Sequence, residues 1–227
     1  MVAAERRIVA IGGWPWQDRH QERRLQEYLL GLARGPRVCL VPTASAEDPS
    51  FLLLGHERWG PLADTSHVRF FPWPPDDLRE LVLAQDLLVV GGGNTANMLA
   101  IWRAHGFEHV LREAWEAGVV LCGWSAGMIC WFEAGVTDSF GPELAAMRDG
   151  LGFLPGSACP HYDGEELRRP RYRRFVGEGF PAGYAADDGV GLHFEGSALA
   201  ETVSVRDGGA AYRVERGEET PLETRLL

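Results

Sequence analysis

The sequence contains few cysteines, little positive charge and no long hydrophobic run, and each shortage excludes a class of protein. None of its four cysteines, Cys39, Cys122, Cys130 and Cys159, forms a C-x-x-C pair, so we expect buried thiols in a reducing compartment rather than disulfides or a zinc site. Lysine and arginine total 22 against 32 acidic residues, a formal net charge of −10. That balance argues against nucleic acid and anionic membrane surfaces as partners. No stretch approaches the roughly 18 consecutive apolar residues of a membrane span.

The remaining composition is that of an ordinary soluble globular protein. Hydrophobic residues make up 45% and charged residues 24% of 227 positions, which is enough for one sizeable core and short for two full domains. The segment 1–7 leads directly into the apolar run 8–11, which is too short for the core of a signal peptide. Because the chain has no internal repeat and no linker, we expect one domain over residues 1–227, located in the cytoplasm.

Short apolar segments alternate with helical patterns over the first two thirds of the chain. The predicted strands are residues 8–11, 38–41, 68–71, 87–90 and 119–122, each bounded by glycine, proline or polar residues. The predicted helices lie around residues 25–32 and over 75–83, 96–105 and 107–117. This alternation predicts a three-layer α/β sandwich with a mostly parallel sheet. In the last third, segments 185–194, 199–205 and 211–215 alternate with glycine turns, which predicts antiparallel hairpins near the C-terminus.

Residues 118–130 read G-V-V-L-C-G-W-S-A-G-M-I-C, an apolar run, a G-x-S-x-G motif and a second apolar run. Between a strand and a helix, this motif holds its serine, here Ser125, on a sharp turn at the carboxyl edge of the sheet. The flanking glycines permit the unusual backbone angles of that turn. The positive end of the following helix favours an oxyanion nearby. We interpret Ser125 as a nucleophile, and the alternative is a serine that only caps the helix.

A second glycine-rich segment, Gly91-Gly92-Gly93-Asn94-Thr95-Ala96, follows the predicted strand 87–90 and opens a helix. It matches G-x-G-x-x-A, but it follows roughly the fourth strand and lacks the acid that closes the next strand of a dinucleotide site. It also has no lysine, which a Walker loop requires. Acyl transfer instead needs backbone N–H donors for its oxyanion, and the candidate donors are Gly92, Gly93 and Ala126.

A serine nucleophile needs a base, and the base needs an acid that orients it. Among seven histidines, His161 is the candidate base because it follows a short apolar segment and a proline, and no set of metal ligands emerges. The candidate acids are Glu133, Asp138, Asp163, Asp187 and Asp188. The pair 187–188 stands between two apolar segments, where burial of two unpaired carboxylates would cost free energy, so a functional role would explain them. An Asp-Gly hairpin turn is an equally good explanation of that pair.

These motifs, in their order along the chain, resemble peptidase E, the aspartyl dipeptidase, whose serine peptidase family includes cyanophycinase. The segments that carry the resemblance are 91–95, 123–127, Pro160-His161 and Asp188-Gly189. The resemblance implies a fold similar to class I glutamine amidotransferases. It also implies that Ser125 is the nucleophile, His161 the base, and the loop 91–93 with Ala126 the oxyanion hole. The family's acid is often glutamate, and Asp188 in that place is one methylene shorter, so it must approach by a backbone shift.

The resemblance further implies a small-peptide substrate, in the family typically a dipeptide with N-terminal aspartate, and a homodimer. We expect no cofactor and no metal. In a protein of charge −10, an acidic substrate needs a local cation. The densest basic run, residues 168–174, offers Arg168, Arg169 and Arg171, whose guanidinium groups can hold a carboxylate bidentately. The alternative for this run is a solvated helix start. Asn94 and Thr95 are also predicted to contact the substrate.

Two other functions are alternatives to a peptidase. An esterase of the α/β-hydrolase type orders its triad serine, acid, histidine, whereas the best acid here follows the histidine. A catalytically weak binding or sensor domain on the same scaffold would be favoured by an unfilled third triad position or a blocked pocket. A glutamine amidotransferase is excluded because serine stands in place of its cysteine. Two rigid aromatic loops, 14–16 and 72–75, either line a cleft or pack on the surface.

Overall fold

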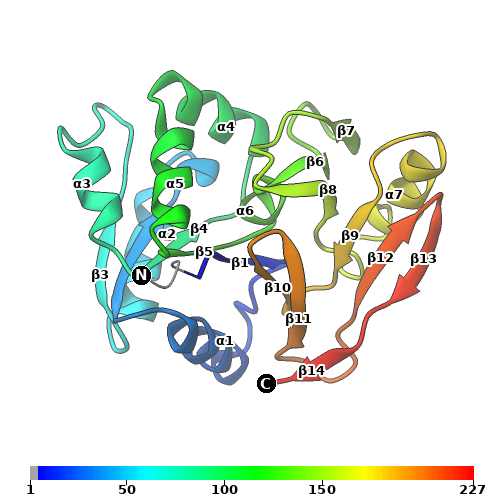
Figure 1. Ribbon diagram of the computed structural model, residues 1–227, viewed down its shortest axis with the longest axis horizontal. Coiled ribbons are helices and arrows are strands. Elements are labelled where there is room, and N and C mark those ends of the chain that lie inside the picture. The colour runs from blue at the N-terminus through cyan, green and yellow to red at the C-terminus, as the bar shows by residue number, and fades with distance from the viewer. Residues whose placement is uncertain (1–4) are drawn as a thin grey trace.

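The computed structural model of the chain describes residues 5–227, so residues 1–4 of the N-terminal segment 1–7 lie outside the described residues. Two β-sheets with flanking helices make up this part of the chain (Figure 1). The helices are α1 (Arg19–Leu32), α2 (Pro49–Trp59), α3 (Leu78–Leu83), α4 (Thr95–Ala104), α5 (Phe107–Glu116), α6 (Ala126–Ile129) and α7 (Arg168–Gly177), with one 3₁₀ turn, η1 (Thr43–Ser45).

The larger sheet contains the predicted parallel core. Its eight strands are β1 (Arg7–Ile11), β2 (Arg37–Val41), β3 (Asp64–His67), β4 (Leu87–Val90), β5 (Val120–Trp124), β10 (Val190–Glu195), β11 (Ala198–Ser204) and β14 (Thr224–Leu226). Their order across the sheet is β14-β11-β10-β1-β5-β4-β2-β3. The pairings among β1 to β5 are parallel, whereas β10 runs antiparallel to both β1 and β11. The strand before Ser125, β5, therefore lies inside the sheet between β1 and β4.

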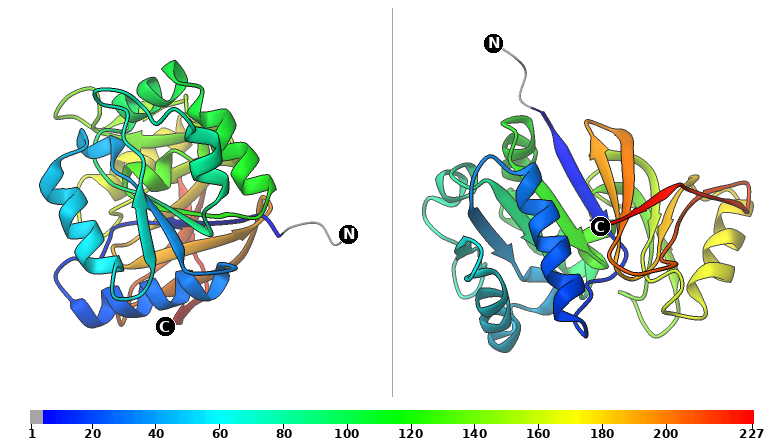
Figure 2. Two further views of the ribbon diagram at one scale, coloured as in Figure 1. Left: turned by 90° about the vertical axis from the view of Figure 1, so that its left-hand side faces the viewer. Right: turned by 90° about the horizontal axis from the view of Figure 1, so that it is seen from below.

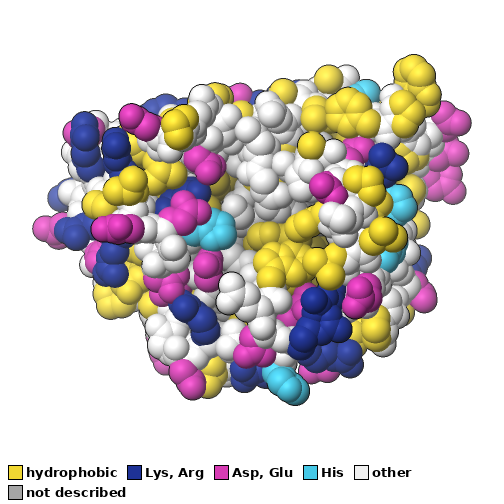
Figure 3. Space-filling model, turned by 180° about the vertical axis from the view of Figure 1, so that it is seen from behind, with side chains coloured by type: hydrophobic (Ala, Val, Ile, Leu, Met, Phe, Trp, Pro, Cys, Tyr) yellow, Lys and Arg dark blue, Asp and Glu magenta, His cyan; other side chains and the backbone are white. Residues whose placement is uncertain are grey.

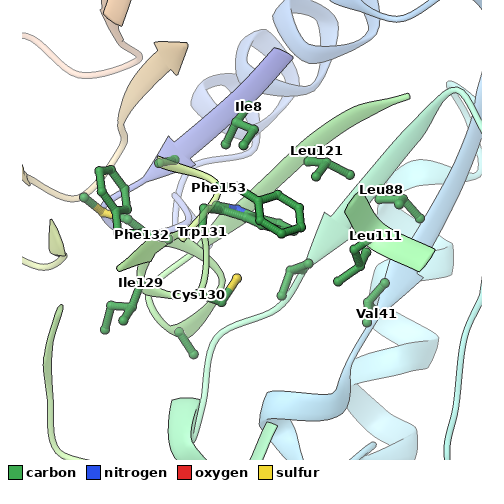
Figure 4. Packing of buried hydrophobic residues seen from close by; sticks show 14 of the residues in the cluster. Ile8, Val41, Leu88, Leu111, Leu121, Ile129, Cys130, Trp131, Phe132 and Phe153 are labelled. Carbon is green, nitrogen blue, oxygen red and sulfur yellow. The ribbon is translucent and has the colours of Figure 1, made fainter. Parts of the chain in front are cut away.

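Helices cover both faces of this sheet, because successive side chains of a strand point to opposite faces and both sets are apolar here. On one face Val9 packs in a cluster with Leu29 of α1 and with side chains of α2. On the other face Ile8 and Leu121 belong to a cluster that includes Leu111 of α5 and residues of α3, α4 and α6 (Figure 4). Helices, sheet and helices thus form the three predicted layers.

The smaller sheet has six strands and extends the molecule beyond this sandwich (Figure 2). Its strands are β6 (Phe132–Thr137), β7 (Ala145–Met147), β8 (Leu154–Cys159), β9 (Gly183–Ala186), β12 (Ala211–Glu215) and β13 (Glu218–Pro221), in the order β13-β12-β9-β8-β6-β7. Helix α7 packs against it, with Tyr172 and Val176 buried beside Val136 and Cys159. The neighbours β8 and β9 are parallel, so their carboxyl ends meet at one edge of the sheet.

The mostly parallel sheet and the C-terminal hairpins β10–β11 and β12–β13 confirm the predicted fold class. Two local predictions were wrong. The predicted strand 68–71 is displaced, since β3 ends at His67. The N–H of Val68 still bonds to the carbonyl oxygen of Leu40, and Val68 and Phe70 are buried in the core. The predicted strand 185–194 is divided at residues 187–189 between the two sheets. The smaller sheet and α2 were not foreseen, because their short segments carry mixed periodicity.

No helix within residues 5–227 is long and apolar enough to cross a membrane. In the same range, no group of three or more histidine, cysteine, aspartate or glutamate side chains is placed to hold a metal ion.

Candidate active site

Ser125 occupies the sharp turn between β5 and α6. Its backbone angles, φ 56° and ψ −112°, belong to a sparsely populated region that persists only where the surroundings enforce it. Both flanking glycines are needed, because a Cβ on Gly123 would lie 2.7 Å from the carbonyl oxygen of Gly127, and one on Gly127 would lie 2.4 Å from that of Val90. The Ser125 side chain makes no capping hydrogen bond to α6. The serine is thus held out of the sheet with its hydroxyl uncommitted.

His161 and Asp188 meet because β8 and β9 are parallel neighbours and each residue follows one of these strands. The Nδ1 atom of His161 lies 2.6 Å from Oδ1 of Asp188. This hydrogen bond, against a smaller opposing effect of burial, holds the pKa of Asp188 below its usual value. An ionised carboxylate can only accept, so Nδ1 carries the proton and Nε2 of the neutral ring is left as an acceptor. The other four candidate acids make no hydrogen bond to His161 within the described residues.

Two glycines make room for the Asp188 carboxylate. A Cβ on Gly13 would lie 1.9 Å from Oδ1 of Asp188, and a Cβ on Gly164 would lie 2.6 Å from Oδ2. The backbone of Gly13 also accepts a hydrogen bond of 2.8 Å from the N–H of Gly189. The loop after β1 and the loop after β8 therefore enclose this carboxylate closely from two sides.

Ser125, His161 and Asp188 line one cavity of about 640 Å³. Figure 3 shows a face that is hollowed, with hydrophobic side chains gathered beside the hollow and charged groups around it. The aromatic side chains in the lining are Trp14, Trp16 and Trp124. The hydroxyl of Ser125 makes no hydrogen bond to His161 among residues 5–227, but such catalytic contacts are often long without substrate and tighten when it binds.

Backbone N–H groups surround the serine on the side of the loop 91–94. A Cβ on Gly92 would lie 3.2 Å from Cβ of Ser125, so this glycine passes directly beside the serine. The N–H groups of Gly92 and Gly93 donate to no other described residue. Ala126 is the first residue of α6, and the N–H groups of a first helical turn have no acceptor within the helix. These three donors can serve an oxyanion at Ser125.

The structure separates the two polar residues that follow this loop. Asn94 caps α4, since its Oδ1 accepts from the N–H of Asn97 at 2.9 Å and its Nδ2 donates to the carbonyl oxygen of Ser139 at 3.0 Å. It also lines a second, smaller pocket of about 300 Å³ that Ser125 shares. Thr95 is 1% exposed and lines neither pocket. The prediction that Thr95 contacts substrate is therefore not supported, because its hydroxyl faces Thr137 in the interior.

One of the three candidate arginines lines a pocket together with Ser125. Arg168 is buried and lines the smaller pocket. Its Nε donates to Glu165 at 2.7 Å and its Nη1 to the carbonyl oxygen of Val136 at 2.8 Å. Arg169 is paired with Glu219, and neither Arg169 nor Arg171 lines a pocket that contains Ser125. Arg169 is rotated about 100° around α7 from Arg168, so it faces another direction. Arg171 lies about one turn further along the helix, 4.0 Å from Glu143.

The sequence did not indicate the roles of three residues around Asp188. Gly13 and Arg206 were not named, and Asp163 was named only as an alternative triad acid and not as a contact of Asp188. The signal for Gly13 was present, because it follows the apolar run 8–11 and such loops meet at the carboxyl edge of a parallel sheet. Of the two aromatic loops, 14–16 lines the cavity, whereas Trp73 in the loop 72–75 is exposed.

Comparison with known proteins adds three findings. The sequence profile of peptidase family S51 matches residues 8–202. An uncharacterized peptidase of Bacillus subtilis (strain 168), YgaJ, is 44% identical over 230 residues, covering 98% of this chain and 99% of its own.

Two crystal structures share the fold. A peptidase from an acI-B1 Actinobacterium has a TM-score of 0.69 at 15% identity and covers 98% of this chain and 95% of its own. A putative peptidase E protein from Listeria monocytogenes EGD-e has a TM-score of 0.67 at 18% identity and covers 89% of this chain and all of its own. The chain belongs to peptidase family S51, a family of serine peptidases.

Proposed function

We propose that Ser125, His161 and Asp188 form a catalytic triad that hydrolyses peptide bonds through an acyl-enzyme. The observation that carries this proposal is the 2.6 Å contact between His161 and Asp188 on the wall of the cavity that also contains the strained Ser125 turn. The order of events follows from the proton positions. Nε2 of His161 takes the hydroxyl proton as Oγ of Ser125 attacks the carbonyl carbon, and Asp188 stabilises the resulting imidazolium.

The tetrahedral oxyanion then accepts hydrogen bonds from the N–H groups of Gly92, Gly93 and Ala126. Collapse of this intermediate breaks the C–N bond, and His161 returns the proton to the leaving amine. A water molecule, deprotonated by His161, attacks the ester carbon in the second half, and the carboxylic acid and free Ser125 are released.

The positions of the two pockets support a placement of the two halves of the substrate. His161 lines the larger cavity and is absent from the lining of the smaller pocket. Because His161 must protonate the leaving amine, that half of the substrate occupies the larger cavity beside Trp14 and Trp16. The acyl half then occupies the smaller pocket, whose volume of about 300 Å³ is at the lower end for a small-molecule site.

The charges of the smaller pocket support an exopeptidase that binds a free amino-terminal residue. Asp138 and Glu165 line it with exposed carboxylates, which suit an α-ammonium group, and Arg168 suits a carboxylate. Dipeptides with N-terminal aspartate present both charges, so they are the proposed first substrates. Such a substrate would have to compete with Glu165 for Arg168, because the two side chains are hydrogen-bonded at 2.7 Å.

A dipeptide panel tests this proposal. We expect hydrolysis of Asp-Leu, loss of hydrolysis when its amino group is acetylated, and no turnover by Ser125→Ala. Asp188→Asn should lose far more activity than Asp187→Asn, since Asp187 bonds to the N–H of Ala210 and not to His161. Arg168→Met should lose hydrolysis of Asp-Leu while keeping hydrolysis of Leu-Leu. Arg169→Met is the matched control, because it also removes an arginine from an ion pair. If the two arginine variants affected both peptides equally, the proposed preference for N-terminal aspartate would be contradicted.

We also propose that the enzyme works as a homodimer in the cytoplasm. The resemblance to peptidase E supports the dimer, and the four cysteines support a reducing compartment because all are buried and free. Light scattering should give twice the chain mass of 25.1 kDa. A monomer mass at micromolar concentration would contradict the proposed dimer.

A further inference from the structure

Asp188 depends on its backbone position more than a longer acid would. It stands in the turn 187–189, where the chain passes from β9 of the smaller sheet to β10 of the larger one. An aspartate has one rotatable bond fewer than glutamate, so a small backbone displacement moves its carboxylate by a similar distance. Something must hold this turn against the loop that carries His161.

Asp163 supplies such a contact. It lies two residues after His161, and its Oδ1 accepts a hydrogen bond of 3.0 Å from the backbone N–H of Asp188. The loop after β8 is therefore joined to Asp188 twice, through the His161 ring to the side chain and through Asp163 to the backbone. Both bonds must be made together, because they link the same two short segments.

Arg206 makes the Asp163 contact electrostatically possible. Its Nη2 forms an ion pair with Oδ2 of Asp163 and lies 3.9 Å from Asp187. Without this cation, three carboxylates of residues 163, 187 and 188 would face one another, and like charges would separate the loops. Arg206 comes from the turn after β11, so it brings a third segment to the site.

We propose that Asp163, neutralised by Arg206, is the positioning residue that holds the backbone of Asp188 where its carboxylate reaches His161. This inference rests on the proposed triad. Asp163 does not itself line the substrate cavity, although its partners Asp188 and Arg206 do, so it acts on the reaction through Asp188. An ordinary surface contact between two loops would instead affect stability and leave the chemistry at His161 unchanged.

The first readout needs no substrate. The proton on Nδ1 of His161, held in a short bond to a carboxylate, gives a low-field proton NMR signal, which His161→Gln identifies by its loss. We expect Asp163→Ala to abolish or broaden this signal. Asp163→Asn keeps an acceptor for the Asp188 N–H and should preserve more of it. Asp207→Asn is the matched control, because Asp207 is an exposed acid next to Arg206 that makes no hydrogen bond among the described residues.

The second readout is turnover of the dipeptide that the wild type hydrolyses best. Asp163→Ala should lower kcat about 10- to 100-fold with KM within about threefold, in line with the effect of an ångström-scale misplacement. The acidic limb of its pH profile should move to lower pH, since a displaced Asp188 stabilises the imidazolium less. The inference would be overturned if Asp163→Ala kept the low-field NMR signal, the kcat and the acidic limb of the pH profile of the wild type. If that variant does not fold, Arg206→Gln decides by the NMR signal, which needs no substrate and is therefore independent of the place of Arg206 in the cavity lining. Loss or broadening of the signal supports the inference, and a wild-type signal overturns it.

Ser125→Ala and Asp188→Asn separate this result from the proposed function. If either variant keeps wild-type turnover, the triad itself is wrong. If both are inactive and Asp163→Ala behaves as the wild type, only the positioning role is wrong.

Discussion

Gly13→Ala tests the site through a single methyl group. The new Cβ would lie 1.9 Å from Oδ1 of Asp188 and 3.0 Å from Cε1 of His161. Since an ordinary contact begins near 3.4 Å, the carboxylate oxygen must move by about 1.5 Å. Movement on that scale breaks the 2.6 Å bond to His161, and Gly164 restricts the carboxylate on its other side. Misplacement by an ångström costs roughly 10²-fold in rate, and loss of the triad acid roughly 10⁴-fold.

We therefore expect Gly13→Ala to lower kcat/KM by roughly 10²- to 10⁴-fold, measured on the best dipeptide of the panel, while circular dichroism shows a folded protein. Gly31→Ala is the control, because a Cβ on that exposed residue of α1 meets no atom within 4 Å. It should leave activity unchanged and stabilise the fold by about 0.5–1 kcal/mol, as alanine does in a helix. A folded Gly13→Ala variant with wild-type kcat/KM would refute the close enclosure of Asp188.

Three further predictions concern the nucleophile, the base and a buried acid. Ser125→Ala should lose several orders of magnitude in kcat, whereas Cys122→Ala should keep its activity, because burial raises the pKa of that thiol far above neutral pH. An inactive but folded Cys122→Ala would contradict the choice of nucleophile. The kcat/KM value should fall on acidification, because a protonated imidazole cannot accept the Ser125 proton, and a kcat/KM value that does not depend on pH would argue against His161 as base. Burial raises the pKa of Asp187 to about 6, so the folded state holds a proton that the unfolded chain has already released. Stability from this residue is therefore present at pH 4 and lost as pH rises through 6. Asp187→Asn should raise the free energy of unfolding by about 2–3 kcal/mol at pH 8 and by little at pH 4, measured by urea unfolding, and equal gains at both pH values would contradict the shift.

Much of the fold could be predicted because its signals are local. Alternating apolar and helical segments predicted the parallel core, since strands buried on both faces read as short continuous apolar runs. The divided segment 185–194 could not be predicted, because both halves are apolar and nothing local shows that β9 and β10 join different sheets. The displaced β3 could not be predicted either, because its own residues, Asp64–His67, are polar and the apolar Val68 and Phe70 are buried just beyond its end.

The sequence by itself determined the Ser125 turn. The two glycines that this turn requires stand within two residues of the serine, so the constraint is written in five consecutive positions. The glycine-rich loop 91–94 and the histidine after Pro160 were likewise recognisable from their neighbours. These features depend on backbone conformation over a few residues, which local sequence controls.

Only the tertiary structure decided which acid contacts His161 and which arginine lines a pocket beside Ser125. Five acids fitted the sequence, and the parallel pairing of β8 with β9 selects Asp188 by bringing residues 27 positions apart into contact. The direction of α7 selects Arg168 over Arg169, although the two are adjacent in the chain. The link from Asp163 to Arg206 spans 43 positions. Such contacts depend on how strands pair and how helices are rotated against a sheet, and these are properties of the folded chain that no local pattern records.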